Sequence, residues 1–255
     1  GYAGMTAAEI EEFQKKDNAG RLKITTAFGL NEDGTCYKDL YTFGGRSFSI
    51  FTGDGERVFD SGAQFEEITA ELLPEHFNTN HTENEFESRS DDKGPEPEGV
   101  TVGEINGRTY AFIGFERLGG VMVYDITDPE NPTYQAYINN RDFSVNMEEL
   151  QKEGDDALQD GLSKVGDLGA EGLAFVPAED SPNDHNLLIV GNEVSGTTTV
   201  FQVDSLVEQP TETAPSPSTS SLSKGGVIAI ALAALAIVVG ALGALGNLIV
   251  AVVSK

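Results

Sequence analysis

The chain has 255 residues, with 42 acidic and 16 basic side chains and a formal net charge of −26. All acidic residues precede Lys224, so the negative charge belongs to the part of the chain before an uncharged apolar tail. A field of this sign repels nucleic-acid phosphates, and we therefore expect no nucleic-acid partner. The single cysteine, Cys36, excludes an intramolecular disulfide framework and a cysteine-cluster zinc site.

Residues 1–205 are predicted to form an all-β domain with short helical insertions. Thr6 and Glu9 have the spacing of a capping box, which predicts a short helix to about Lys16. Residues 147–158 predict a helical insertion. Alternating apolar runs bounded by glycine or aspartate predict short antiparallel strands at residues 46–51, 57–59, 109–113, 120–126, 186–190 and 198–203.

Two stretches of this domain are copies of one unit. The first unit, residues 97–126, begins with Glu98 followed by glycine, and its second strand ends at Glu116. The second unit, residues 170–203, has Glu171 and Glu193 at the same two places. Repeated antiparallel units of this size build β-propeller blades. Residues 1–205 hold too few units for a closed ring, so we expect the C-terminal blades of an incomplete propeller that lacks N-terminal blades.

Two further segments follow the β domain. Residues 206–224 are rich in proline, serine and threonine, which predicts an extended stalk. Residues 225–253 carry no charge, and about 20 apolar residues suffice to cross a bilayer, so we predict a transmembrane helix. A cleaved lipid-anchor signal has a similar tail and stays open as an alternative. The predicted location is the cell membrane, with the preceding residues extracellular.

Four blocks of the sequence are specific enough to compare with known families, and they lie at residues 41–50, 88–99, 167–173 and 190–198. Together they resemble the choice-of-anchor I family of secreted β-propeller proteins, over about residues 19–204. The resemblance implies a multi-bladed extracellular domain with a variable surface anchor. Members are often described as alkaline-phosphatase-like, a description that rests on propeller similarity more than on chemistry. Residues 31–39 depart from the aspartate-rich, calcium-loop-like run of the family.

The candidate metal ligands are four glutamates at equivalent positions of the two units, together with two aspartates just before the first unit: Glu98, Glu116, Glu171, Glu193, Asp91 and Asp92. Repeat symmetry brings equivalent residues to a similar radius and height. Like charges brought together repel each other unless a cation or protons neutralise them. Calcium accepts six to eight oxygen ligands in irregular geometry, so calcium is the predicted cofactor.

The glutamates allow three interpretations. They can brace the blades through hydrogen bonds from backbone amides, bind calcium without catalysis, or hold calcium that activates water for phosphoester hydrolysis. The third follows from a resemblance of the Glu-Gly units to calcium-binding propeller phytases and phosphatases. Residues 161–165 lack the second glycine of a nucleophile elbow, so no Ser-His-Asp site is predicted. We expect a membrane-anchored extracellular propeller that binds an unknown extracellular ligand, with a calcium-dependent phosphoesterase as the alternative.

Overall fold

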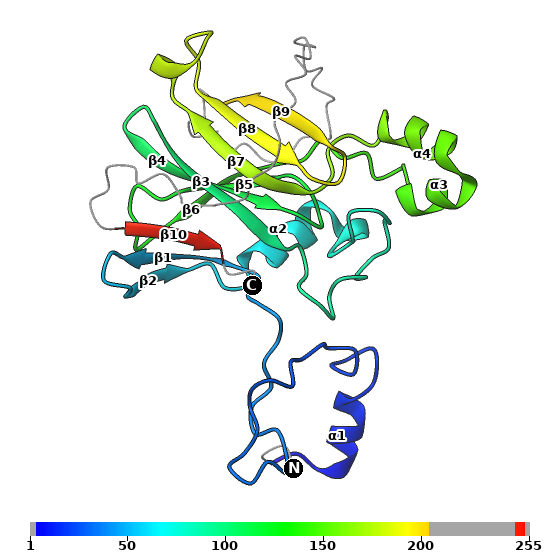
Figure 1. Ribbon diagram of the computed structural model, residues 1–255. Helices are drawn as coiled ribbons and strands as arrows, with labels where there is room; N and C mark the ends of the chain where they lie inside the picture. Colours follow the sequence, from blue (N-terminus) through cyan, green and yellow to red (C-terminus); the bar gives the residue numbers. More distant parts are fainter. Residues whose placement is uncertain (1–3, 204–247, 253–255) are drawn as a thin grey trace.

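The computed structural model describes residues 4–203 and 248–252, which fold into three antiparallel sheets and a few short helices. The first sheet has the order β10 (Leu248–Val252), β1 (Phe48–Thr52), β2 (Arg57–Asp60). The middle sheet has the order β3 (Pro97–Ile105), β4 (Arg108–Phe115), β5 (Val121–Asp125), β6 (Thr133–Ile138). The third sheet has the order β7 (Ala170–Val176), β8 (Leu187–Asn192), β9 (Thr197–Gln202). Figure 1 shows them as three layers, with the middle sheet between the other two.

The helices of the described residues are α1 (Ala7–Phe13), α2 (Gln64–Leu72), α3 (Met147–Glu153) and α4 (Asp155–Leu162), with single 3₁₀ turns at Pro74–His76 and Ala178–Asp180. Helix α2 lies against the sheets, where its Phe65 joins their core, whereas α1, α3 and α4 lie farther out (Figure 1). The predicted capping box of α1 is confirmed, because Thr6 and Glu9 each accept a hydrogen bond from the other's backbone amide. The predicted helical insertion is two helices, because Gly154, at φ +119°, interrupts the helical backbone between them. Helix α2 and strand β6 were not predicted.

The mostly β architecture and the predicted strand positions are confirmed. Among the described residues, however, the three sheets do not close into a barrel or into a propeller ring. Each unit does contribute one sheet in which consecutive strands pair as neighbours. The two units are therefore confirmed as repeats of one topology. The described sheets do not form the propeller ring that the sequence predicted.

The C-terminal tail differs from its prediction where the structure describes it. The predicted stalk at 206–224 and most of the predicted transmembrane segment at 225–253 lie outside the described residues. Leu248–Val252, the last part of that segment, is strand β10 and not helix, and it pairs antiparallel with β1 from Phe48 opposite Val252 to Thr52 opposite Leu248. Valine and isoleucine favour strands wherever an unpaired strand edge is in reach. In the described part of the chain, no helix is long and apolar enough to span a bilayer.

Hydrophobic cores cover both faces of the middle sheet. On one face Phe48 of β1 and Phe65 of α2 pack with Tyr124 of β5; the Phe48 and Tyr124 ring centroids are 5.0 Å apart. On the other face Phe112 of β4 packs with Leu188 of β8, and both side chains are fully buried. Burial on both faces explains why β4 and β5 are continuous apolar runs and not alternating ones.

Candidate functional site

A β-bulge positions the first candidate glutamate. In the first unit Pro97 pairs with Phe115 and Gly99 pairs with Gly114, so Glu98 is an extra residue of β3 at a shift in the strand register. A bulge bends the strand locally and re-aims the side chain of the extra residue. Glu98 is therefore turned out of the regular alternation at the end of the sheet.

The second unit has the same bulge at the equivalent place. Ala170 pairs with Asn192 and Gly172 pairs with Gly191, which leaves Glu171 as the extra residue of β7. The repeated bulge was not predicted from the sequence. The Glu-Gly pair that both units share was the signal that could have revealed it. Bulges next to functional sites are common, and this one defines the equivalent end of both sheets.

The other two candidate glutamates lie directly beside the bulges. Glu116 follows the last residue of β4, and Glu193 follows the last residue of β8. Their backbone amides are held by carbonyl oxygens, that of Glu96 for Glu116 at 2.8 Å and that of Gly169 for Glu193 at 2.8 Å. Each unit thus presents two glutamates at one end of its sheet, and we call the four together the glutamate rim.

Close packing of the two sheets brings the two halves of the rim together. A Cβ added to Gly99 would lie 2.1 Å from the carbonyl oxygen of Glu171, and one added to Gly114 would lie 2.7 Å from that of Ala170. Real Cβ atoms do not approach oxygen so closely, so glycine is required at these two positions. The glycine of the first Glu-Gly pair therefore permits the backbone of the second bulge to pack against it.

Glu171 and Glu193 are in direct contact within the rim. Their carboxyl groups share a hydrogen bond, and this bond, partial burial and the negative charges of Glu193, Glu98 and Glu116 together raise the pKa of Glu171 to about 7. Two carboxyl groups can share such a bond only when one of them carries a proton. The contact therefore places a proton, or a cation in its stead, at an exposed position at the end of the third sheet.

The two candidate aspartates lie against basic side chains. Arg21 is 3.5 Å from Asp91, and Lys23 is 2.9 Å from Asp92. Burial alone would raise the pKa of Asp92, but the hydrogen bond from Lys23 and the nearby charge of Arg89 lower it overall. These aspartates therefore already have counter-charges. Within residues 4–203 and 248–252, no three histidine, cysteine, aspartate or glutamate side chains are grouped closely enough to hold a metal ion.

Sequence reasoning missed a buried charge cluster next to the rim. The Glu96 side chain has no exposed surface, and it forms ion pairs with Arg89, Lys93 and Arg117. Burial alone would raise the pKa of Glu96, but hydrogen bonds from Lys93 and Arg89 and the charge of Arg117 lower it. Its backbone has φ +51°, a left-handed conformation that is uncommon for a glutamate and is held here by the surrounding contacts.

Arg117 connects this cluster to the glutamate rim. Its Nε lies 2.8 Å from Oε2 of Glu116, whose other oxygen is 3.2 Å from Nδ1 of His81. The only signal in the sequence was the closeness of Arg89 and Lys93 to the first Glu-Gly pair. Nothing in the sequence distinguishes a glutamate that is buried among three cations from one on the surface.

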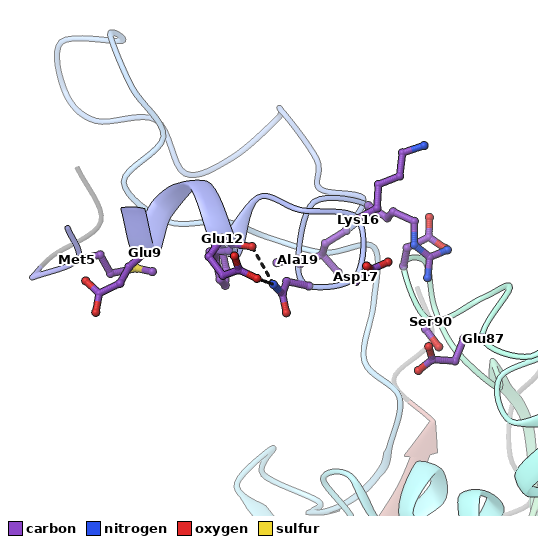
Figure 2. Close-up of a pocket in the computed structure, with 13 residues that line it drawn as sticks. Met5, Glu9, Glu12, Lys16, Asp17, Ala19, Glu87 and Ser90 are labelled. Carbon is purple, nitrogen blue, oxygen red and sulfur yellow. Dashed lines mark hydrogen bonds and ion pairs between the residues drawn. The ribbon is translucent and has the colours of Figure 1, made fainter. Parts of the chain in front are cut away.

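The cavity drawn in Figure 2 lies elsewhere, between α1 and the loop around residues 87–91. It has a volume of about 1010 Å³ and is open to solvent. Apolar side chains of the N-terminal region, Met5, Phe13 and Leu22, line it together with several acidic residues. Asp91 is the one predicted site residue in its lining. The cavity and the glutamate rim are therefore separate features.

Comparison with known proteins establishes the family. The choice-of-anchor I domain matches residues 3–129. Gigasin-3a of Magallana gigas is 32% identical over 207 residues, which cover 78% of this chain and 69% of that protein. The chain belongs to the choice-of-anchor I family, as the four sequence blocks implied. No solved structure matches the chain significantly.

A second relative is more distant. The mesenchyme-specific cell surface glycoprotein of Strongylocentrotus purpuratus is 24% identical over 131 residues, which cover 46% of this chain. The matched part is 17% of that protein's length, so the chain corresponds to a small part of it.

Proposed function

We propose that this chain is an extracellular surface protein whose repeated sheets serve as a binding module of the propeller type. Three observations support the proposal. The chain belongs to the choice-of-anchor I family, and one relative is named a cell surface glycoprotein. The two units place matching glutamates at the same end of adjacent sheets, which creates one shared rim. Concave or rimmed ends of repeated sheets are where such folds present ligand contacts.

The finer proposal is that the rim binds calcium. The observation that carries it is the contact between Glu171 and Glu193, because two carboxyl groups in hydrogen-bond contact need a proton or a cation between them. The pair supplies up to four oxygen ligands, and calcium completes a shell of six to eight with water or carbonyl oxygens. The charges of Glu98 and Glu116 add negative potential at Glu171. Among the described residues, neither joins the pair in a group of three side chains close enough to hold a metal ion.

A calcium titration of the thermal midpoint tests this proposal. The full chain in non-ionic detergent is heated with calcium or magnesium at constant ionic strength, because any salt screens so acidic a surface. Calcium at ~100 times its Kd stabilises the folded state by about 2.7 kcal/mol. We expect a calcium-specific rise in the midpoint that Glu193→Gln abolishes and that Glu104→Gln, an exposed position of β3, leaves intact. Equal effects of both ions in all three proteins would contradict the site.

The phosphoesterase alternative has no support of its own in the described part of the chain. The basic side chains nearest the rim, Arg89, Lys93 and Arg117, are all paired with carboxylates. The test is hydrolysis of a chromogenic phosphomonoester by the same protein samples, with and without a chelator. Hydrolysis that the chelator abolishes would support the alternative.

We also propose that residues 225–253 attach the protein to a membrane, because this run is uncharged and long enough to cross a bilayer. In the attached protein Leu248–Val252 would belong to the membrane segment and would not pair with β1 as strand β10 does. The chain is expressed behind a secretion signal, once complete and once ended before Ser221. The complete chain is expected in the membrane fraction and the shortened one in the medium. Release of both without detergent would contradict the attachment.

A further inference from the structure

The cavity between α1 and the loop around residues 87–91 has one apolar wall. Met5 lies just before α1, Phe13 is the last residue of the helix, and Leu22 follows it. Each of the three is between 37% and 40% exposed. Single exposed apolar side chains are ordinary, but apolar side chains that together line a hollow are typical of binding sites.

The opposite wall of the cavity is polar and acidic. It consists of Glu87, Ser90 and Asp91, in the loop before the middle sheet, and Figure 2 shows Glu87 and Ser90 across the cavity from α1. The backbone of Glu87 has φ +58°, and its amide donates a hydrogen bond to the carbonyl oxygen of Phe77 at 2.8 Å. This contact holds the turn that carries the Glu87 carboxylate.

Contacts between the N-terminal segment and the loop hold the two walls in place. The amide of Lys23 donates to the carbonyl oxygen of Asp91 at 2.9 Å, and Nζ of Lys23 lies 2.9 Å from Asp92. Arg21 lies 3.5 Å from the Asp91 carboxylate. The separation of the walls is therefore set by the fold.

The cavity has an excess of negative charge. Its lining has more carboxylates than cations, namely Glu9, Glu12, Asp17, Glu87 and Asp91 against Lys16 and Arg21. Among the described residues, no ion pair or side-chain hydrogen bond occupies the carboxylates of Asp17 and Glu87. Figure 2 shows the Lys16 side chain pointing away from Glu87. The cavity therefore offers two carboxylates beside an apolar wall.

We propose that this cavity binds a basic segment of another protein. An apolar side chain of that segment packs on Phe13 and Leu22, and its lysine or arginine side chains face Asp17 and Glu87. Complementary charge steers such a segment to the cavity and selects it over neutral or acidic ones. The proposal is independent of the calcium site and of membrane attachment.

Charge and size favour this occupant over a part of the same chain or a second copy. After residue 203 the sequence holds only Lys224 and Lys255 as basic residues, so it contains no segment with several cations. A second copy carries the same net charge of −26 and is repelled. The volume of about 1010 Å³ lies at the upper end of the roughly 300–1,000 Å³ of ligand sites, so several side chains can enter.

Fluorescence anisotropy with a synthetic peptide tests the proposal. The probe is a short fluorescent peptide in which lysines flank a single phenylalanine, and serine replaces the phenylalanine in the comparison peptide. The protein is the full chain in non-ionic detergent without calcium, and the signal of detergent alone is subtracted. We expect the phenylalanine peptide to bind about tenfold more tightly, because its ring is buried on the apolar wall.

Two double variants show whether the charges of the cavity are responsible. Asp17→Asn with Glu87→Gln removes the two carboxylates of the cavity, whereas Glu104→Gln with Glu130→Gln removes the same charge from exposed positions elsewhere. We expect about fivefold weaker binding for the first variant and a change of less than about twofold for the second.

Two single variants show whether the apolar wall is responsible. Leu22→Ser removes part of that wall, and Val200→Ser is the matched control, at a position outside the cavity that is 54% exposed. We expect about fivefold weaker binding for L22S and unchanged binding for V200S. Circular dichroism and the thermal midpoint verify that each variant folds, and the double variants decide the matter if L22S does not.

Four results would overturn the proposal. No binding of the phenylalanine peptide is the first, and equal affinity of the two peptides is the second, because it would mean that the acidic surface attracts any cation. Equal losses in the two double variants would likewise indicate net charge alone. Equal losses in L22S and V200S would show that the apolar contact lies elsewhere. Calcium binding and membrane attachment are measured separately, so failure here leaves those proposals standing.

Discussion

Gly99 lies against the carbonyl oxygen of Glu171, so closely that a Cβ at Gly99 would be 2.1 Å from that oxygen. This contact joins the first Glu-Gly bulge to the second and determines how near the two halves of the glutamate rim can come. The two equivalent glycines of the repeat therefore differ in their surroundings. Gly172 occupies the same position in its own unit as Gly99 does, but a Cβ there would have open space around it.

Gly99→Ala is expected to destabilise the protein, because the new methyl group must push the β7 backbone away. Such overpacking costs about 1–3 kcal/mol. Gly172→Ala is the matched control, and it is expected to change the free energy of unfolding by less than about 0.5 kcal/mol. Urea unfolding of both variants measures the difference. An equal loss in the two variants would contradict the close contact between the sheets.

Stability should depend on pH through Glu171. Its pKa is raised to about 7, mainly by the hydrogen bond with Glu193, whereas an unfolded glutamate titrates near 4.3. Between these values the folded protein holds a proton that the unfolded chain has released, so this group's contribution falls as pH rises from about 4.3 to 7. Glu193→Gln removes the negative charge and should flatten this part of the profile. The measurement is the urea midpoint against pH for both proteins, and identical profiles would exclude the coupled pair.

Calcium and the shared proton should compete. If the cation replaces the proton between Glu171 and Glu193, saturating calcium lowers the pKa of Glu171 and shifts the pH-dependent loss of stability to lower pH. The measurement is the same urea profile with calcium, with magnesium as the control. A profile that calcium leaves unchanged would mean that the pair holds a proton only.

Glu96→Gln is expected to be among the most destabilising single substitutions in the chain. The carboxylate is fully buried and faces Arg89, Lys93 and Arg117, so its loss leaves three cations without their common partner. Removing one partner of a buried ion pair costs about 3–5 kcal/mol. Because the pKa of Glu96 is lowered in the folded state, its contribution is present above the unfolded value and is lost as pH falls. Urea unfolding at pH 7 checks the loss, and Glu104→Gln should change stability little.

Arg141→Lys should destabilise the loop at Glu83 and Asn84. The buried Arg141 guanidinium donates hydrogen bonds to the carbonyl oxygen of Glu83 at 3.0 Å and to Oδ1 of Asn84 at 2.8 Å. Burial lowers its pKa to about 10, yet it stays charged at neutral pH. A lysine cannot reproduce the planar set of donors, and a buried acceptor without a donor costs about 1–3 kcal/mol. Exposed Arg57→Lys is the control, and equal midpoints for the two variants would contradict the role of Arg141.

Short-range features could be predicted from the sequence. The alternation of residues 46–51 and the apolar runs of β4 and β5 predicted strands, because strand formation depends on neighbouring residues and turns. The capping box at Thr6 and Glu9 was predicted for the same reason. The repeated Glu-Gly pair identified equivalent positions in two units, and with them the four rim glutamates.

Long-range contacts were decided only by the tertiary structure. Which charged groups meet depends on the folded chain: Glu171 contacts Glu193 across the paired strands β7 and β8, whereas Asp91 and Asp92 face Arg21 and Lys23. The apolar run at Leu248–Val252 is compatible with a helix in lipid and with a strand, and pairing with the free edge of β1 makes it a strand. Composition and spacing describe each segment alone. Burial, ion pairing and strand pairing depend on the partner that packing brings within a few ångströms.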